Sequence, residues 1–224
     1  MNILVLRTAR RALRYALFEG QRREPEAAGR LRDAGGPDSD HDVVVRRLRQ
    51  VRDCCYCQDP AVELDAIALR ATFGGETFTR PTLVDDDALR RLEDLYPSAP
   101  LQLPQVARLS RCCRDVFHGV DQILVFETAF FADLPPQERF YGLAADLGKA
   151  LGVRRNGFHG VFHQAACSQV ARSLRGREGA AAPRVLSICL EPTPEVAAVI
   201  GVLVEEVGGE LRIAHGHRPF RVRR

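Results

Sequence analysis

The sequence lacks any long uninterrupted apolar segment. Charged residues break every hydrophobic run before it reaches the roughly 18 residues that a membrane-spanning helix needs. The amino terminus also has its apolar run first and its basic residues afterwards, which reverses the order of a secretory signal. We therefore expect a soluble, cytoplasmic protein that has no membrane partner.

Lysine is almost absent, because Lys149 is the single lysine among 32 basic residues and the others are arginine. The net charge of +3 is too small to indicate a nucleic-acid-binding surface, so we expect no nucleic-acid partner. Arginine binds carboxylates and phosphates through two parallel hydrogen bonds, which lysine does not do. The arginine bias therefore supplies groups that suit small anionic ligands.

The number and spacing of the cysteines indicate neither a disulfide framework nor a zinc site. Its seven cysteines are an odd number in a chain without a secretory signal, which argues against a disulfide framework. The cluster of Cys54, Cys55 and Cys57 is followed by the distant pair Cys112 and Cys113, and this spacing does not supply two zinc knuckles. We interpret the cysteines as structural thiols.

The length of 224 residues and the hydrophobic fraction of 46% predict one or two folded domains. Strands are expected at 2–7, 13–18, 62–69, 121–127 and 184–190, and helices at 42–56, 85–96, 104–116, 137–151 and 162–175. The polar, glycine-rich segment 20–41 is expected to be a flexible surface loop, and 196–213 a β-hairpin or a helix with a strand. The alternation of strands and helices predicts an α/β fold with a mixed sheet.

Two strand ends carry candidate functional side chains. Arg70 follows the strand 62–69 and precedes the glycines of the ATFGGE segment, and Glu127 ends the strand 121–127. Ligands of α/β sheets bind at the carboxyl ends of strands. Arg70 there could bind a phosphoryl group or a carboxylate, and Glu127 could hold Mg²⁺ or orient a nucleophile.

A third candidate is the glycine-rich segment RRNGFHGVFH at 154–163. Its glycines permit a close backbone approach or a positive φ. Four of its side chains could face an anion: Arg154, Arg155, His159 and His163.

Five segments, taken in order, resemble the acetate and butyrate kinase family of short-chain fatty acid kinases. They are MNILVLRTARRALRYALFE, LRATFGGETFT, LEDLYPSAPLQLP, ILVFETAFFADLPP and VRRNGFHGVFHQ, and together they span about residues 1–175. The resemblance implies a ribonuclease-H-like half of the actin-like ATPase superfold, with a mixed sheet and flanking helices. It also implies an acetate-kinase-like domain over 1–183, followed by a remnant of the second domain or an extension over 184–224.

Members of this family transfer the γ-phosphoryl group of ATP, with Mg²⁺, to a short carboxylate such as acetate and so form an acyl phosphate. The resemblance assigns substrate and phosphoryl binding to Arg70, and transition-state stabilisation and phosphate binding to His159. Glu127 takes the place of a family aspartate that serves the metal and the nucleotide phosphates. The remaining assignments are the acyl pocket for Leu101 and Phe158, and phosphate binding for Arg14, which keeps the charge of a family lysine.

Other positions depart from the family pattern. Arg7, Arg10 and Arg11 replace the asparagine and two serines of the family's opening loop, and Leu69 and Phe73 replace two histidines. These losses predict impaired transfer. The alternative is a catalytically inactive binding or regulatory module, or a fragment that needs a partner chain. The expected partner is a second copy in a homodimer or a complementing kinase half.

Overall fold

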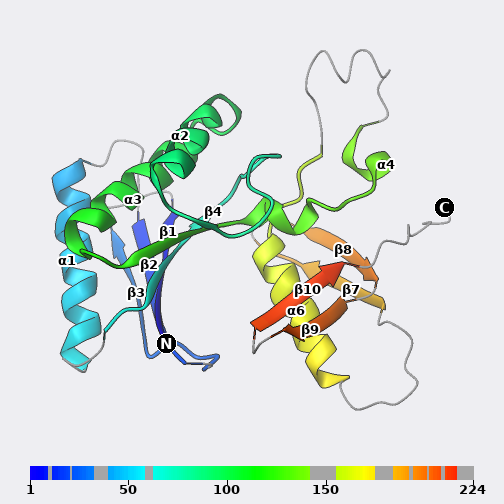
Figure 1. The fold of residues 1–224 in the computed structure, drawn as a ribbon, viewed down its shortest axis with the longest axis horizontal. Helices are drawn as coiled ribbons and strands as arrows, with labels where there is room; N and C mark the ends of the chain where they lie inside the picture. The colour runs from blue at the N-terminus through cyan, green and yellow to red at the C-terminus, as the bar shows by residue number, and fades with distance from the viewer. Residues whose placement is uncertain are drawn as a thin grey trace. The chain divides into compact units, whose positions relative to one another are not determined.

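The computed structural model describes residues 1–9, 12–20, 22–32, 40–58, 63–141, 155–174, 184–191, 194–200, 202–207 and 210–215. The chain divides into two compact units, Met1–Ala129 and Phe130–Arg224, which are considered separately (Figure 1). Among the described residues, no helix has the length and apolar character that crossing a membrane requires. The candidate residues Arg10, Arg11 and Arg154 lie outside the described residues. The division expected near residue 183 stays a prediction.

The first unit contains one six-stranded sheet. Its strands are β1 (Asn2–Ala9), β2 (Ala12–Glu19), β3 (Ala27–Arg32), β4 (Ala66–Ala71), β5 (Thr82–Leu83) and β6 (Asp121–Phe126). They lie in the order β3-β2-β1-β4-β6-β5. The strands β1, β2 and β3 pair antiparallel, β1, β4 and β6 pair parallel, and β5 is antiparallel to β6. The predicted mixed α/β sheet is therefore confirmed.

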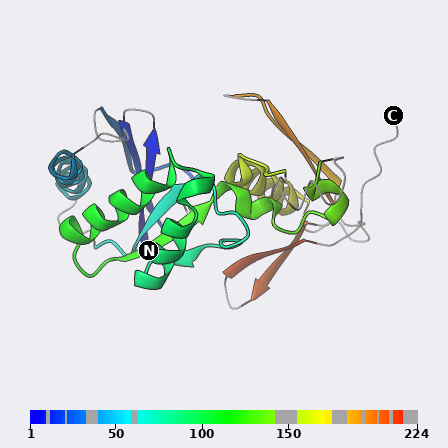
Figure 2. The ribbon, with the colours of Figure 1, turned by 90° about the horizontal axis from the view of Figure 1, so that it is seen from above.

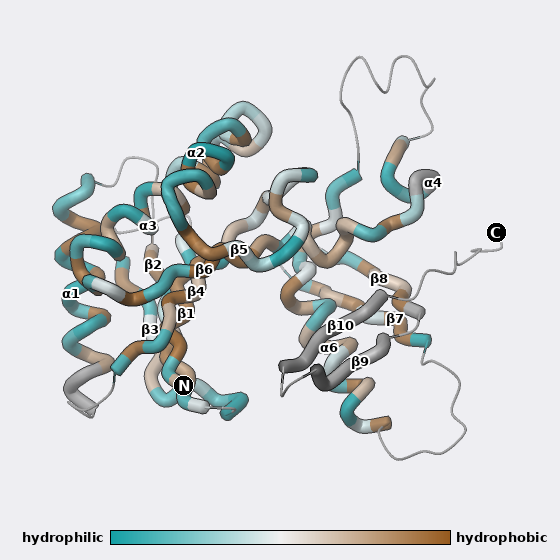
Figure 3. The backbone as a smooth tube through the Cα atoms, viewed as in Figure 1, coloured by the Kyte–Doolittle hydropathy of each residue, from teal (hydrophilic) through white to brown (hydrophobic). Residues whose placement is uncertain are grey.

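Alternating side chains give this sheet one buried face. Leu4 and Leu6 on β1, Ile67 and Leu69 on β4, and Leu124 on β6 are fully buried. The alternation follows from the two-residue period of a strand, which places every second side chain on the same face. Figure 3 shows hydrophobic residues concentrated along these central strands.

Helices cover that buried face. They are α1 (His41–Gln58), α2 (Asp86–Asp94) and α3 (Leu103–Val116), with the short 3-10 helix η1 (Tyr96–Ser98) between α2 and α3. Helix α1 contacts β2, β3 and α3, and α3 contacts β1, β4 and α2. Figure 2 views α1 almost end-on beside the sheet. Leu48 and Val51 of α1 and Leu103 of α3 complete one continuous core.

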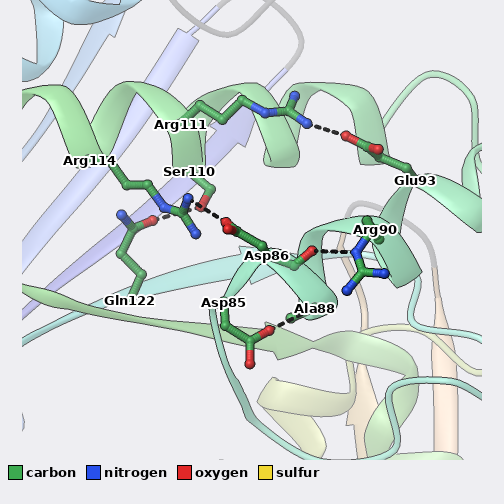
Figure 4. Close-up of polar contacts among 9 residues, drawn as sticks. All are labelled: Asp85, Asp86, Ala88, Arg90, Glu93, Ser110, Arg111, Arg114 and Gln122. Carbon is green, nitrogen blue, oxygen red and sulfur yellow. Dashed lines mark hydrogen bonds and ion pairs between the residues drawn. The ribbon is translucent and has the colours of Figure 1, made fainter.

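Polar contacts fix α2 and α3 on the sheet (Figure 4). Asp85 caps α2 by accepting a hydrogen bond from the backbone nitrogen of Ala88 at 2.6 Å. The hydroxyl of Ser110 on α3 donates to Gln122 Oε1 on β6 at 2.8 Å, and both residues are buried. Two ion pairs join the exposed sides of α2 and α3, between Arg114 and Asp86 and between Arg111 and Glu93.

One sequence expectation is wrong in this unit. Within the expected loop 20–41, residues Ala27–Arg32 form the edge strand β3, which pairs with β2. The segment was mistaken for a loop because an edge strand rests mainly on backbone hydrogen bonds. Its few apolar side chains give only a weak alternation signal. Residues 33–39 lie outside the described residues.

The second unit contains helices and two strand pairs. It begins with the 3-10 helix η2 (Glu127–Phe131, shared with the first unit), α4 (Pro136–Arg139) and α6 (Gly160–Ser173). β7 (Arg184–Cys189) pairs antiparallel with β8 (Glu195–Ile200), and β9 (Val202–Val207) pairs with β10 (Glu210–His215). Of the helix expected at 137–151, the described residues contain only α4, which ends at Arg139, and residues 142–151 lie outside the described part of the chain.

Candidate functional site

Arg70 and Glu127 meet at the edge where two parallel strands end. Arg70 is the penultimate residue of β4, and Glu127 follows the last residue of the neighbouring strand β6. Because β4 and β6 are parallel, their carboxyl ends reach the same edge of the sheet. The Nε group of Arg70 donates a hydrogen bond to Glu127 Oε1, and the two side chains form an ion pair.

The pair combines a buried anion with a partly accessible cation. The side chain of Glu127 is 3% exposed and that of Arg70 is 29% exposed. The arginine uses its Nε group for this contact, and no hydrogen bond to its terminal Nη atoms is found within the described residues. Glu127 therefore orients the guanidinium, which can present its outer edge to an anion.

A turn that contains Gly74 is hydrogen-bonded to this edge of the sheet. The backbone nitrogen of Gly74 donates to the hydroxyl of Thr128 at 2.9 Å. A Cβ atom at Gly74 would lie 2.7 Å from the carbonyl oxygen of Phe78 and 2.8 Å from the ring of Phe126, so only glycine fits without a shift. The turn after β4 is thus tied to the residue that follows Glu127.

His159 occupies a strained position at the start of α6 in the second unit. Its φ of 56° lies in the left-handed region, which is uncommon for a residue other than glycine. Its Nδ1 atom lies 2.9 Å from Glu195 Oε2, and the other oxygen of Glu195 accepts a hydrogen bond from the backbone nitrogen of Phe158 at 3.0 Å. Glu195 on β8 thus fixes both the ring and the preceding peptide group.

Glu195 was missed by the sequence analysis. It is 36 residues from His159 in the chain, and no local spacing connects them. Its position on a strand, among apolar residues, was the only available signal.

The prediction that His163 faces an anion is wrong. His163 is fully buried, and its Nδ1 atom lies 2.8 Å from the hydroxyl of Ser187 on β7. The rings of Phe130, Phe131 and Phe162 lie within 6.0 Å of its ring centre. His163 lies on the buried face of α6 together with Gly160 and Cys167, whereas His159 precedes the helix in a left-handed backbone conformation.

The other predicted residues have less specific surroundings. Arg155 lies over the ring of Tyr141 at 5.3 Å from its centre, and its backbone nitrogen donates to Arg139. Leu101 is 65% exposed and Phe158 is 42% exposed. Their assignment to an acyl pocket stays a prediction.

Arg70 and Glu127 belong to the first unit, whereas His159 and Phe158 belong to the second. The structure therefore brings together Arg70 with Glu127, and His159 with Glu195. Arg14 lies on β2 directly opposite Arg7 of β1.

The fit of Mg²⁺ depends on the carboxylate at position 127. Mg²⁺ keeps several waters and is usually held by one or two carboxylates together with substrate phosphates. Glu127 supplies one such carboxylate, although Arg70 competes for it. The described residues contain no group of three or more His, Cys, Asp and Glu that could hold a metal. The carboxylate of Glu127 therefore suits a metal ion that is bound together with a phosphate ligand. The described residues do not form a complete metal site by themselves.

A second constellation, of Cys112, His41 and Asp115, is structural. His41 Nδ1 lies 3.4 Å from the sulfur of Cys112, and its Nε2 lies 3.2 Å from Asp115 Oδ2. This order of groups is typical of an activated cysteine, but Cys112 is fully buried. Burial, assisted by the charge of Asp115, raises the pKa of the Cys112 thiol to about 11, so it stays protonated at neutral pH. The contact joins α1 to α3.

Solved structures define the class of this fold. The crystal structure of Porphyromonas gingivalis acetate kinase matches 94% of this chain and 56% of its own, with a TM-score of 0.77 and 25% identity. A propionate kinase from Francisella tularensis subsp. tularensis matches 89% of this chain and 55% of its own, with a TM-score of 0.67 and 22% identity. The chain has the ribonuclease-H-like α/β architecture of the actin-like ATPase superfold, as expected.

The family itself is defined by sequence. The model of the acetokinase family matches residues 15–190, and the chain belongs to that family. The acetate kinase of Halothermothrix orenii is 29% identical over 196 residues, which are 77% of this chain and 48% of that protein. The acetate kinase of Parabacteroides distasonis is 31% identical over 185 residues, 73% of this chain and 46% of its own. The chain thus spans about half the length of the curated relatives it matches.

Proposed function

We propose that this chain takes part in ATP-dependent phosphoryl transfer to a short-chain carboxylate such as acetate, giving an acyl phosphate. Membership of the acetokinase family supports the reaction class. The observation that carries the proposal is the Arg70–Glu127 pair at the common edge of β4 and β6.

Arg70 is the group that meets the transferring phosphoryl. Phosphoryl transfer depends on positioning and on neutralising charge on the moving group. The terminal nitrogens of Arg70 can donate two parallel hydrogen bonds to a carboxylate or phosphoryl oxygen. Because Glu127 already holds Nε, the guanidinium has fewer orientations to lose when the anion binds.

His159 is the second proposed catalytic residue. Glu195 accepts a hydrogen bond from its Nδ1–H, and this fixes the ring orientation. The imidazole can then stabilise negative charge on the phosphoryl oxygens. Leu101 and Phe158 are proposed to contact the acyl chain of the substrate, and Arg14 the phosphates. The departures from the family pattern at residues 7, 69 and 73 predict a rate below that of the full-length relatives.

The proposed cofactors are ATP and Mg²⁺. Glu127 would hold the metal, which when bound would neutralise charge on the nucleotide phosphates. A second chain, either another copy or a complementing kinase half, remains the predicted partner. Sedimentation of the protein alone tests the homodimer.

The proposal is tested in the direction of ATP synthesis, from acetyl phosphate and MgADP, with luminescence as the readout. We expect a slow signal that falls at least about a hundredfold in Arg70→Ala, because a preorganised charge-stabilising donor is worth this much. Arg70→Lys keeps the charge and should lose most of the rate, since lysine cannot donate two parallel hydrogen bonds.

Arg46→Gln is the matched control, because Arg46 is exposed on α1 and is equally an arginine. It should leave the rate unchanged. A wild-type signal that persists in folded Arg70→Ala would refute the assignment of Arg70. Absence of any signal from folded wild type alone, together with no increase over the signal of an added full-length kinase, would favour the inactive binding module.

A further inference from the structure

The contact between His159 and Glu195, which lies wholly within the second unit, leaves one ring nitrogen of the histidine available. Nδ1 of His159 lies 2.9 Å from Glu195 Oε2. Among the described residues, no hydrogen bond to Nε2 of His159 is found, and this nitrogen is not a buried atom. The side chain is 19% exposed. A small dissolved molecule can therefore reach Nε2.

The carboxylate of Glu195 determines which ring nitrogen carries the proton. An ionised carboxylate only accepts hydrogen bonds, so Nδ1 of His159 is the donor in this contact. In the neutral imidazole the other nitrogen then has no proton and keeps its lone pair. Nε2 can thus act as a nucleophile, and Glu195 can compensate the positive charge that the ring gains when Nε2 forms a bond.

The same carboxylate holds the backbone next to the ring. The second oxygen of Glu195 accepts a hydrogen bond from the backbone nitrogen of Phe158 at 3.0 Å, and His159 has a left-handed φ of 56°. Strained conformations persist where the surrounding contacts fix them, and they cluster at functional sites. A ring that is already oriented loses less freedom when its nitrogen attacks a bound molecule.

The other histidines whose side chains are described do not share this arrangement. His163 is fully buried, and His41 uses both of its ring nitrogens in contacts with neighbouring side chains. His118 is exposed and has no carboxylate partner in the described part of the chain. Among these four histidines, His159 therefore combines an oriented ring with an accessible nitrogen.

We propose that His159 is a site of covalent phosphorylation by an acyl phosphate, with Nε2 as the nucleophile and Glu195 as its positioning residue. The lone pair of Nε2 attacks phosphorus, the bond between phosphorus and the acyl oxygen breaks, and the carboxylate leaves with that bonding pair. The proton on Nδ1 stays in the hydrogen bond to Glu195, so the new N–P bond forms without removal of a proton. The products are an N-phosphohistidine and a free short-chain carboxylate.

The choice of an acyl phosphate as donor rests on the proposed function, whose product belongs to that class. An acyl phosphate is a mixed anhydride with a good leaving group, so it can phosphorylate a nitrogen without a nucleotide. A protein that makes ATP from acetyl phosphate and MgADP but takes no covalent label would keep the proposed function and refute phosphorylation of His159. A labelled protein that makes no ATP would do the reverse.

The test is incubation of the full chain with radiolabelled acetyl phosphate, without nucleotide and without metal. We expect a label that acid removes and that alkali and hydroxylamine leave in place, because N-phosphohistidine behaves in this way. A phosphorylated carboxyl group would instead lose its label to hydroxylamine. Fragmentation mass spectrometry at neutral pH should place the phosphoryl group on His159.

Two comparisons exclude other sources of the label. The folded chain should be labelled at least about tenfold faster than the same chain unfolded in urea, because only the folded chain orients the ring. Equal rates would refute the site. A parallel incubation with ATP labelled in its γ-phosphate, with Mg²⁺, tests the donor, and faster labelling from ATP would overturn the choice of an acyl phosphate.

Variants then test the two residues separately. His159→Asn should abolish the label, and asparagine suits the left-handed backbone, so the variant is expected to fold. Glu195→Gln should slow labelling by about tenfold or more, because the amide can donate to Nδ1 and so stabilise the wrong tautomer. Glu191→Gln is the matched control, since Glu191 is an exposed glutamate between the same two strands, and it should be labelled at the wild-type rate.

Three results would overturn the proposal. They are the absence of label from folded wild type, a label that hydroxylamine removes, and a label that persists in folded His159→Asn. Equal labelling rates in Glu195→Gln and Glu191→Gln would refute the positioning role of Glu195.

Discussion

The two side chains of the Arg70–Glu127 pair, at the edge of the first sheet, contribute differently to stability and to anion binding. Glu127 is buried and Arg70 is partly exposed. Removing Arg70 and removing Glu127 therefore change the free energy of unfolding by different amounts. Burying a carboxylate is unfavourable, and the arginine offsets this cost. The arginine itself keeps contact with solvent and remains able to bind an anion.

This asymmetry makes a prediction about stability. Arg70→Ala should lower the free energy of unfolding by about 2–4 kcal/mol, because the buried carboxylate loses its ion pair. Glu127→Gln should cost less, about 1 kcal/mol, since the arginine can be solvated and the amide oxygen still accepts its hydrogen bond. Urea denaturation of both variants checks this order, and an equal or larger cost for Glu127→Gln would contradict it.

The buried thiols predict sensitivity to alkali. Burial raises the pKa of Cys55 and Cys112 from 9.0 to about 11, and it also raises the pKa of Cys113 well above 9.0. A raised pKa in the folded state means that the unfolded thiol ionises first. The stability from these thiols is complete below about pH 9 and declines as the pH rises toward about 11, by about 1.4 kcal/mol for each pKa unit.

Urea midpoints at pH 7.5 and pH 10 measure this effect. Cys113→Ala should have a smaller difference between the two midpoints than the wild type, although it is less stable at both. A midpoint that does not change with pH in the wild type would show that the thiols are not desolvated.

Whole elements were predictable wherever one face of them is buried. The hairpin β1–β2, the strand β6 and the helices α2 and α3 follow from their apolar periods, because those periods match the buried faces. The location of Arg70 and Glu127 at strand ends also followed, from the apolar runs that precede them, but the parallel pairing that brings the two ends to one edge did not. The edge strand β3 did not, since its pairing depends on the backbone.

The partners of the candidate side chains could not be predicted in the same way. Pairing of Arg70 with Glu127 depends on rotamers, and the contact of His159 with Glu195 joins residues that are distant in the chain. His163 was misplaced because helical phase, which buries it beside Ser187, was weighed less than its nearness to His159.

The left-handed backbone of His159 at the start of α6 predicts that two variants with the same loss of activity differ in stability. His159 holds a left-handed backbone conformation, which costs a residue with a Cβ atom about 1–2 kcal/mol. His159→Gly and His159→Ala both lose the contact to Glu195, but only glycine relieves the backbone. The glycine variant should therefore be about 1 kcal/mol more stable than the alanine variant in thermal unfolding, and both should lose transfer activity. Equal stabilities would show that the backbone is not strained.

The cap of α2 gives a prediction with an internal control. Asp85→Ala removes the hydrogen bond to the nitrogen of Ala88 and should cost about 1 kcal/mol. Asp87→Ala removes only exposed ion pairs with Arg90 and Arg91 and should cost about 0.5 kcal/mol or less. A larger loss for Asp87→Ala in urea denaturation would contradict the capping role.

At the scale of the whole molecule, the chain combines membership of the acetokinase family with a proposed site at one edge of its first sheet. The acetokinase match covers residues 15–190, and Arg70, Glu127 and His159 all lie within it. Arg7 on β1 lies directly opposite Arg14 on β2 and beside Arg70 on β4. The balance between transfer and plain anion binding decides what the chain does.

The most direct measurement of this balance is formation of acetyl hydroxamate from acetate, MgATP and hydroxylamine, with wild type and Arg70→Ala compared side by side. We expect hydroxamate from the wild type and its loss in Arg70→Ala, with both proteins folded by circular dichroism. Equal hydroxamate from the two proteins, or none from either, would contradict it.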